Sequence, residues 1–361
     1  MKIGILTAHA KYSYEMSLQA YALQEFLRKN GHEAEVIDYR PAVFDAWNES
    51  FRGNVKQKKE NYEKFQSQFL HFSKTVRNRA EAEQLAGKYD LLITAGTGVF
   101  DGKITRGLKP VYYGCFDKAV KKAACAISIR KNEAAAFEEE FSRKYLNTFG
   151  MISACDSAIA ERLQAYTDTN VETTASLLML LETEDYRQLV TQLQPSFIGR
   201  RIQKARAKQR KAAPYVLLHT VDGEWTVRKV AEMLIEDTGL SVIHNCTNVA
   251  FMKQQGTVAA CGPEQVVAYI AEAEYVVTNV AETAVLAARF GKKLLLVAPG
   301  PDEQRMIEFA KAAGLEAQLI NDKADYAGPK QTEIEIAVVA QRMNNMKETL
   351  ERSIRSGLEN I

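Results

Sequence analysis

A short turn at residues 279–283 carries side chains suited to chemistry. It reads Asn-Val-Ala-Glu-Thr, so an amide, a carboxylate and a hydroxyl lie close together in the chain. A carboxylate can act as a general acid or base, and Asn and Thr can donate and accept hydrogen bonds. The turn is therefore a candidate ligand site that includes Asn279, Glu282 and Thr283.

The sequence around this turn predicts a strand, a helix and a second strand. The β-branched run Tyr275–Thr278 is typical of a buried strand, and Ala284–Phe290 favours a helix that Gly291 ends. Leu294–Val297 is again apolar and completes a parallel crossover unit. The turn then lies at the carboxyl end of a strand, where ligands bind in open α/β sheets and where a helix N-terminus favours an anion. In the same place Glu282 has an alternative role, which is to stabilise the first helical turn through the helix dipole.

The composition is that of a globular chain with two domains. At 361 residues the chain is too long for one ordinary hydrophobic core. With 46% hydrophobic and 25% charged residues it can form two such cores. The formal net charge of +2 is too small to indicate a polyanion partner for the whole chain. The N-terminus MKIGILTAHA reads as a strand and not as a leader or a membrane span, so the expected location is the cytoplasm.

The cysteines predict neither a disulfide framework nor a metal site. The five cysteines are odd in number and form no C-x-x-C pair, so we expect no zinc, and nothing else indicates a cofactor. Cys155 is expected to be a structural thiol, because a nucleophile needs a base for which the sequence offers no evidence.

Alternating strand and helix patterns predict two Rossmann-like domains. Lys2–Thr7, a helix over Leu18–Leu27 and the strand Glu35–Tyr39 form a β-α-β unit without a G-x-G-x-x-G fingerprint, so a dinucleotide cradle is not supported. A second alternation starts at Tyr215–Thr220, and the helical pattern from Thr332 onward is expected to cross back to the first domain. The predicted boundaries are 1–195 for the N-terminal domain, 196–214 for a linker and 215–361 for the C-terminal domain.

The predicted linker is a local basic patch. We expect it to lie in solvent; the alternative is peripheral contact with an anionic membrane surface, where each basic residue contributes about 1 kcal/mol. Specific nucleic-acid binding is not expected, because no aromatic residues are interleaved for base stacking. The basic residues are Arg200, Arg201, Lys204, Arg206, Lys208, Arg210 and Lys211.

Several stretches resemble the polysaccharide pyruvyl transferase family. Leu18–Leu23 and Val36–Pro41 match the family's L-Q-A-Y-A-L and V-I-D-Y-R-P segments, and the AGTGVFDG stretch stands in place of its G-S-D-Q-V-W-N loop. The frame that ends at Gly291 and Lys292 is similar to the family's C-terminal signature. The resemblance runs from Lys2 to about Val297. It implies two Rossmann-like domains that face each other across a cleft, as in type B glycosyltransferases.

The resemblance implies transfer of a pyruvyl group from phosphoenolpyruvate to a sugar of a cell-surface glycan or lipid-linked sugar. With it comes a predicted site: Glu282 is the catalytic residue, and the substrate-binding residues are His9, Tyr14, Gln19, Gly96, Thr97, His219, Asn279 and Thr283.

Several motif positions depart from the family's pattern. Glu282 stands where the family has His, Val280 where it can have Arg, and Cys155 where it has another Arg, so the cations that would hold phosphate and carboxylate are missing there. Two alternatives therefore stay open. One is an inactive family member that acts as a binding or structural partner, and the other is a glycosyltransferase-like enzyme whose sugar nucleotide places its diphosphate at residues 279–283. The sequence carries no signal for the oligomeric state.

Overall fold

The computed structural model divides the chain into two compact units. The N-terminal unit comprises Met1–Leu181 and Asn344–Ile361, and the C-terminal unit comprises Glu182–Met343. The predicted basic linker, except for Pro214, lies outside the residues that the structure describes. The described residues are 1–44, 55–102, 104–105, 109–117, 120–129, 139–191, 214–220, 225–246, 257–258 and 260–360.

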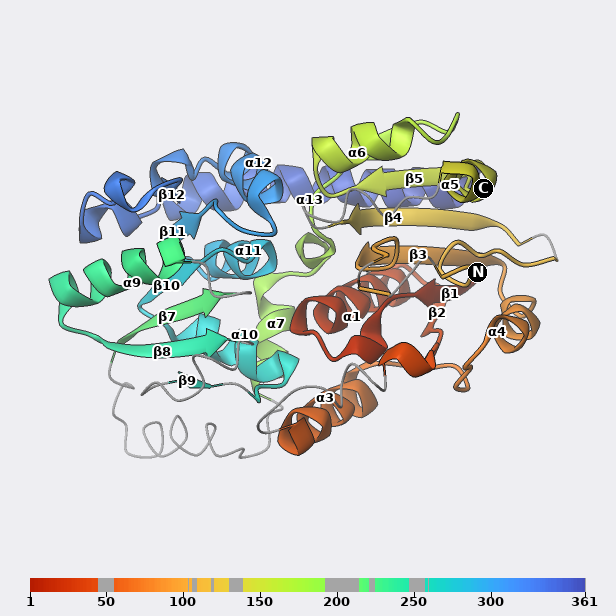
Figure 1. The fold of residues 1–361 in the computed structure, drawn as a ribbon, viewed down its shortest axis with the longest axis horizontal. Coiled ribbons are helices and arrows are strands. Elements are labelled where there is room, and N and C mark those ends of the chain that lie inside the picture. Colours follow the sequence, from red (N-terminus) through yellow and green to blue (C-terminus); the bar gives the residue numbers. More distant parts are fainter. Residues whose placement is uncertain are drawn as a thin grey trace. The chain divides into compact units, whose positions relative to one another are not determined.

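Within the described part of the N-terminal unit, parallel strands form one sheet in the order β2-β1-β3-β4-β5-β6 (Figure 1). Ile3 of β1, for example, pairs with Leu91 of β3. The residues of β3 and β4 are buried throughout, because helices cover both faces of a parallel sheet and its strands become continuous apolar runs. The strands are β1 (Lys2–Leu6), β2 (Glu33–Val36), β3 (Leu91–Thr97), β4 (Lys122–Ser128), β5 (Met151–Ala154) and β6 (Val171–Thr173).

The helices of the N-terminal unit begin and end at residues suited to those places. The side chain of Asn78 accepts a hydrogen bond from the backbone N–H of Glu81 at the start of α4, and Asp156 does the same for Ile159 of α6. Helix α1 contacts β2 and β3, and α6 contacts β5 and β6. These helices are α1 (Tyr14–Lys29), α3 (Val55–Phe69), α4 (Arg79–Ala86), α5 (Glu139–Leu146) and α6 (Ser157–Gln164).

The described strands of the C-terminal unit form a second parallel sheet in the order β12-β11-β10-β7-β8-β9 (Figure 1). Its central strands are apolar and buried, and Val277 and Leu295 belong to the same core cluster as Val216. The strands are β7 (Tyr215–Thr220), β8 (Ser241–Cys246), β9 (Thr257–Val258), β10 (Tyr275–Thr278), β11 (Lys293–Val297) and β12 (Leu319–Ile320).

The last helix, α13, contributes residues to both units. Residues up to Met343 belong to the C-terminal unit, and the residues from Asn344 onward belong to the N-terminal unit. The helices of the C-terminal unit are α7 (Thr183–Thr191), α9 (Trp225–Thr238), α10 (Pro263–Glu272), α11 (Ala281–Arg289), α12 (Glu303–Ala313) and the first part of α13 (Ile336–Asn360).

The predicted fold class is confirmed, since both sheets are parallel and flanked by helices. Two element boundaries near the predicted site differ from the sequence pattern, which placed a loop at residues 95–102 and the start of a helix at Ala284. Strand β3 continues through a register shift to Thr97, because Gly96 adopts a positive φ of 82° that the irregular strand requires. Helix α11 begins at Ala281, so Glu282 and Thr283 lie in its first turn and not in a loop before it.

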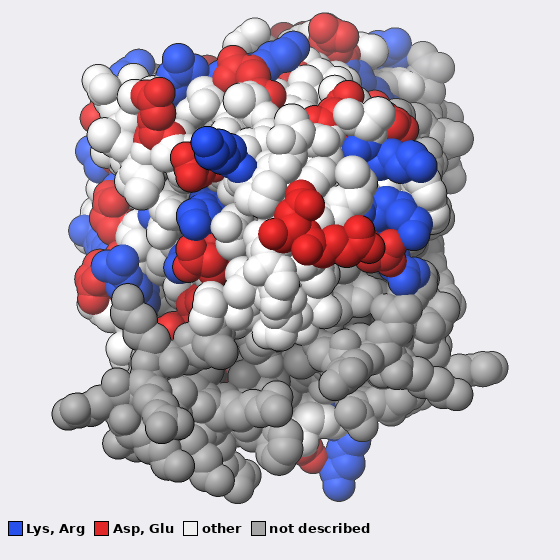
Figure 2. All heavy atoms as spheres, turned by 90° about the vertical axis from the view of Figure 1, so that its left-hand side faces the viewer, with Lys and Arg blue, Asp and Glu red and all other residues white. Residues whose placement is uncertain are grey.

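No helix in the described residues is both long and apolar enough to cross a membrane. On the face that Figure 2 shows, Lys and Arg are interspersed with Asp and Glu. This agrees with the small formal net charge of +2.

Candidate functional site

The strand order of the C-terminal sheet changes direction between β7 and β10. The chain passes from β7 to β8 on one side and returns to β10 on the other, so the carboxyl ends of β7 and β10 form the switch point where ligands bind in doubly wound sheets. The hydroxyl of Thr278 donates to the backbone oxygen of His219 over 2.8 Å. The Nδ1 atom of His219 lies 2.6 Å from the hydroxyl of Thr283. The structure thus brings His219, Asn279 and Thr283 to one edge.

Glu282 lies at the same edge, in an ion pair with Arg305 of α12. The other terminal nitrogen of Arg305, Nη1, lies 3.3 Å from Oδ1 of Asp302. The second oxygen of Asp302 accepts a hydrogen bond of 3.2 Å from the backbone N–H of Ala281, at the start of α11. The three charged side chains are 0%, 5% and 5% exposed for Glu282, Arg305 and Asp302. We call them the Glu282–Arg305–Asp302 cluster.

Two histidines of the neighbouring strands are uncharged at neutral pH. Burial lowers the pKa of His219 to about 3, and the nearby charge of His244 acts in the same direction. Burial also lowers the pKa of His244 to about 4, with a further contribution from Arg228. At pH 7 neither imidazole supplies a positive charge to this switch point, whereas Arg305 does.

The loop after β11 comes close to Asn279. A methyl group added to Gly300 would lie 3.0 Å from the amide nitrogen of Asn279, and Gly300 has a φ of 152°. Glycine therefore lets the backbone of this loop approach a predicted substrate-binding residue. Asp302, which follows two residues later, belongs to the charged cluster.

In the N-terminal unit, three predicted substrate-binding residues meet at the carboxyl end of β3. The side-chain oxygen of Gln19 accepts a hydrogen bond of 2.8 Å from the backbone N–H of Thr97, and its nitrogen donates to the hydroxyl of Thr97 over 3.1 Å. A methyl group on Gly96 would lie only 2.5 Å from the same oxygen of Gln19. Both side chains are about fully buried, so this contact fixes the irregular end of β3 against α1.

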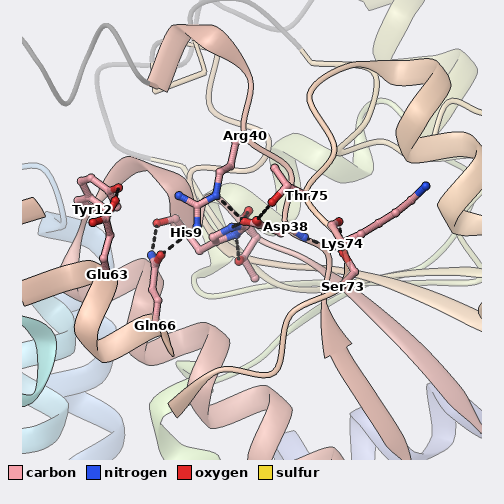
Figure 3. Close-up of polar contacts among 10 residues, drawn as sticks. His9, Tyr12, Asp38, Arg40, Glu63, Gln66, Ser73, Lys74 and Thr75 are labelled. Atoms are coloured by element: carbon pink, nitrogen blue, oxygen red, sulfur yellow. Dashed lines mark hydrogen bonds and ion pairs between the residues drawn. The ribbon is translucent and has the colours of Figure 1, made fainter. Parts of the chain in front are cut away.

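His9 is fully buried in a polar network beyond the end of β1 (Figure 3). Its Nε2 atom lies 3.0 Å from the carboxylate of Asp38, which also accepts hydrogen bonds from Arg40 and Thr75. Gln66 of α3 receives a hydrogen bond from Arg40 and donates one of 3.1 Å to the backbone oxygen of His9. The network therefore joins the ends of β1 and β2 to helix α3.

The two ionisable side chains His9 and Asp38 of this network have lowered pKa values. Burial lowers the pKa of His9, and the Asp38 carboxylate only partly offsets that effect. Burial alone would raise the pKa of Asp38, but the hydrogen bonds from His9 and Thr75 and the charge of Arg40 outweigh it and lower the pKa to about 2. Asp38 is thus an anion at neutral pH, held by neutral and cationic partners.

The remaining predicted residues are placed as follows. Tyr14 is the first residue of α1 and is 6% exposed. The thiol of Cys155 donates to the backbone oxygen of Ala126 over 3.1 Å. Among the described residues, no group of three or more His, Cys, Asp or Glu side chains could hold a metal ion.

A family model named polysaccharide pyruvyl transferase matches residues 17–280 of the sequence, which is most of the chain and includes strands of both sheets. The chain belongs to the polysaccharide pyruvyl transferase family. No curated protein matched this member significantly.

Solved structures with the same fold include a protein bound to UDP, a UDP-GlcNAc 2-epimerase and a glycosyltransferase. A co-structure of S. aureus MnaA with UDP has a TM-score of 0.55 at 12% identity, covering 100% of this chain and 97% of that one. The UDP-GlcNAc 2-epimerase of Neisseria meningitidis, bound to UDP-GlcNAc, has a TM-score of 0.52 at 10% identity and covers 99% and 94%. A glycosyltransferase of Rickettsia africae has a TM-score of 0.50 at 12% identity and covers 99% and 97%. At such identities the likeness concerns the fold, and the family match together with this fold supports a glycan-modifying enzyme.

Sequence reasoning missed Arg305 and Asp302. The motif positions Val280 and Cys155 had suggested that cations were absent, but Arg305 reaches the first turn of α11 from the next helix. A strand and a loop separate the two segments in sequence, so no local spacing signals the contact. Asp38 was within the matched V-I-D-Y-R-P segment, and only its pairing with His9 required the structure.

Proposed function

We propose that this family member transfers a pyruvyl group from phosphoenolpyruvate to a pair of hydroxyls on one sugar of a cell-surface glycan. In this reaction the enol carbon gains a proton and becomes a methyl group. The two sugar oxygens bond to the neighbouring carbon, their protons leave, and the phosphate departs with its bridging oxygen. The donor carries phosphate and carboxylate, so the reaction requires a cation and a proton donor at the same place.

The observation that carries the proposal is the position of Arg305. Its guanidinium lies at the first turn of α11, where the family's motif can have Arg before His and where this chain has Val280 and Glu282. A cation contributed by α12 thus compensates for the cation that the motif lacks. Asp302 and Glu282 hold that guanidinium in one orientation through hydrogen bonds, as a positioned anion-binding group requires.

The cost of such a cluster also supports a functional role. Replacing a buried ion pair by apolar residues of similar volume is often neutral or stabilises a protein by about 1–4 kcal/mol. A cluster with side chains at most 5% exposed is therefore a poor means of stabilising the fold. Its place at the ligand-binding edge of the sheet gives it a use in binding and proton transfer.

A second candidate is a non-catalytic family member that binds a glycan or supports an active relative. The observation that favours it is that Glu282 engages Arg305, whereas a proton donor must first carry a proton. A sugar-nucleotide enzyme is favoured less, because Asp302 already accepts a hydrogen bond from the N-terminus of α11, where a diphosphate would bind.

The test is phosphate release from phosphoenolpyruvate in the presence of a panel of glycans, followed by mass spectrometry of the glycans for the added pyruvyl ketal. Arg305→Met should weaken phosphoenolpyruvate binding at least 100-fold, whereas Arg342→Met, at an exposed arginine of the same unit, should leave it unchanged. Glu282→Gln should slow transfer by about 100-fold or more while the protein stays folded, if Glu282 delivers the proton.

The second candidate predicts different results. The wild-type chain would release no phosphate with any glycan, and Arg305→Met would not change its glycan binding. Glu282→His would then be informative, since it restores the residue of the family motif. Phosphoenolpyruvate-dependent activity that appears only in Glu282→His would identify the natural chain as a member that has lost catalysis.

A further inference from the structure

The guanidinium of Arg40, in the polar network of the N-terminal unit, is held by fixed partners (Figure 3). Its Nε atom donates to Oδ1 of Asp38 over 2.7 Å, and its Nη2 atom donates to Oε1 of Gln66 over 3.3 Å. Asp38 also accepts hydrogen bonds from His9 and Thr75. Gln66 is fixed by its hydrogen bond to the backbone oxygen of His9. The charged group is therefore oriented in advance, which reduces the entropy lost when a ligand binds it.

The same guanidinium is accessible to solvent. Its side chain is 23% exposed, compared with 8% for Asp38, so solvent reaches the cation more than its buried partner. The Tyr12 hydroxyl contacts the guanidinium as well. Burial and the charge of Glu63 raise the pKa of this hydroxyl to about 12, whereas its hydrogen bond with Arg40 acts in the opposite direction. A guanidinium has more N–H groups than these contacts use, and its planar fork matches a carboxylate or a phosphate.

A hydroxyl and a carboxylate lie beside Arg40. The hydroxyl of Tyr12 donates to Oε1 of Glu63 over 3.0 Å, and Nζ of Lys59 lies 3.8 Å from the same oxygen. The side chain of Glu63 is 47% exposed. An ionised carboxylate only accepts hydrogen bonds, and both contacts use Oε1, so Oε2 of Glu63 can accept one from the hydroxyl of a ligand.

The charges of these residues are balanced, so they do not oppose an anion at Arg40. Asp38 is an anion, because its pKa is lowered to about 2, and it pairs with Arg40. Glu63 pairs with Lys59 of the same helix. Burial lowers the pKa of His9, so this ring adds no charge at neutral pH. The oriented N–H groups of Arg40 then decide which ligand binds.

We propose that Arg40 binds a carboxylate or phosphate group of the acceptor glycan and that Glu63 accepts a hydrogen bond from a hydroxyl of the same sugar. The inference rests on the proposed function and adds that the acceptor is acidic. Ionised phosphoenolpyruvate has anionic groups but no O–H group, so it matches Arg40 and not Glu63, whereas an acidic sugar offers both. Tyr12 and Arg40 follow β1 and β2, at the carboxyl ends of parallel strands where ligands bind in such sheets.

The experiment is an NMR titration of the full chain with matched sugars, without phosphoenolpyruvate. The probes are a neutral methyl hexoside, the corresponding methyl uronide and the hexose 1-phosphate, each in the gluco, galacto and manno series. An acidic sugar of one series should bind at least about tenfold more tightly than its neutral counterpart, as expected for a hydrogen bond to a charged group. The anion that gives the preference distinguishes a uronic acid of the glycan from the phosphate of a lipid-linked sugar.

Variants separate the two contacts. Arg40→Gln should remove the preference and leave binding of the neutral sugar unchanged. Glu63→Gln should weaken neutral and acidic sugars alike, by about threefold, because an amide oxygen accepts more weakly than a carboxylate. Arg28→Gln is the matched control, since Arg28 also lies 3.0 Å from a carboxylate, that of Glu25, and is 43% exposed; it should bind as the wild type.

A second variant covers the case in which Arg40→Gln does not fold because Asp38 loses its partner. Arg40→Lys keeps a positive charge beside Asp38 but removes the planar fork, so thermal unfolding should show a folded chain whose Kd for the acidic sugar is about tenfold higher. An unchanged Kd in Arg40→Lys would overturn the inference.

The remaining outcomes are distinguishable. If no acidic sugar binds more tightly than its neutral counterpart, or if the preference persists in Arg40→Gln, the inference is wrong. If Arg40→Gln weakens neutral and acidic sugars alike, Arg40 only supports the fold. Acidic sugars that bind through Arg40 but receive no pyruvyl group would confirm this contact and refute the proposed function. Pyruvyl transfer to neutral and acidic glycans with equal KM would do the reverse.

Discussion

Removal of Arg305 should destabilise the C-terminal unit strongly, and removal of its partner should relieve much of that loss. Arg305→Met leaves Glu282 and Asp302 as buried carboxylates without their guanidinium, and breaking a buried pair in this way costs about 3–5 kcal/mol. In the double variant Glu282→Gln, Arg305→Met, one of these carboxylates is neutral. The double variant should therefore be more stable than Arg305→Met by about 2 kcal/mol.

The coupling free energy from this double-mutant cycle isolates the pair from other effects of each substitution. A matched cycle at Lys229 and Glu232 provides the control, because their ionic groups lie 2.6 Å apart but are 43% and 47% exposed. Exposed pairs contribute about 0.2–1 kcal/mol, so the control coupling should be at least twofold smaller.

Urea unfolding followed by fluorescence measures these free energies in the relevant unit. The sequence contains two tryptophans, and a Trp47→Phe background leaves Trp225 of α9 as the reporter of the C-terminal unit. Because a two-unit chain can unfold in more than one step, only the transition seen by Trp225 enters the cycle. A loss below 1 kcal/mol for Arg305→Met, or equal couplings for the two pairs, would refute the buried cluster as described.

Two further predictions concern stability. The folded pKa values of His219 and His244 are about 3 and about 4, below the unfolded value of 6.5. As the pH falls, the unfolded state therefore binds protons before the folded state does. The C-terminal unit should lose stability between about pH 6.5 and pH 4, by up to roughly 3 kcal/mol for each histidine. His219→Asn should flatten that dependence in urea titrations, and an unchanged slope would contradict the burial of its ring. Gly96→Ala should destabilise the N-terminal unit more than Gly31→Ala. Both glycines have a φ near 80°, but only at Gly96 would the new methyl group lie against Gln19. Equal shifts in thermal unfolding would show that the contact with Gln19 is unimportant.

Most of the fold could be predicted from the sequence because parallel strands have a strong local signature. Tyr275–Thr278 is β-branched and apolar and was placed correctly, since a strand buried on both faces needs no polar alternation. The start of α11 was placed three residues too late. Val280 is a poor N-cap, and the first turn is stabilised instead by Asp302 from a later segment, which no local pattern indicates.

Only part of the candidate site could be predicted from the sequence. His219, Asn279 and Thr283 each follow or end a strand, or begin the next helix, so the parallel topology alone brings them to one edge. The charge balance of that edge depends on Arg305, whose contact with Glu282 spans a helix, a strand and a loop. Gln19 shows the same limit, because its side chain contacts Thr97 across a large separation in the sequence.

The division of α13 between the two units has a consequence for how the chain is made. Leu350 and Ile354 are buried, Ser353 hydrogen-bonds to Glu172 of β6, and the backbone at Gly357 packs against Met151 of β5. A ribosome synthesises these residues after the whole C-terminal unit. The surface of the N-terminal unit that residues 344–361 cover therefore stays exposed while the whole C-terminal unit is synthesised. The two units cannot simply fold one after the other as the chain emerges. Synthesis of residues 344–361, and not of Leu181, therefore completes the first unit.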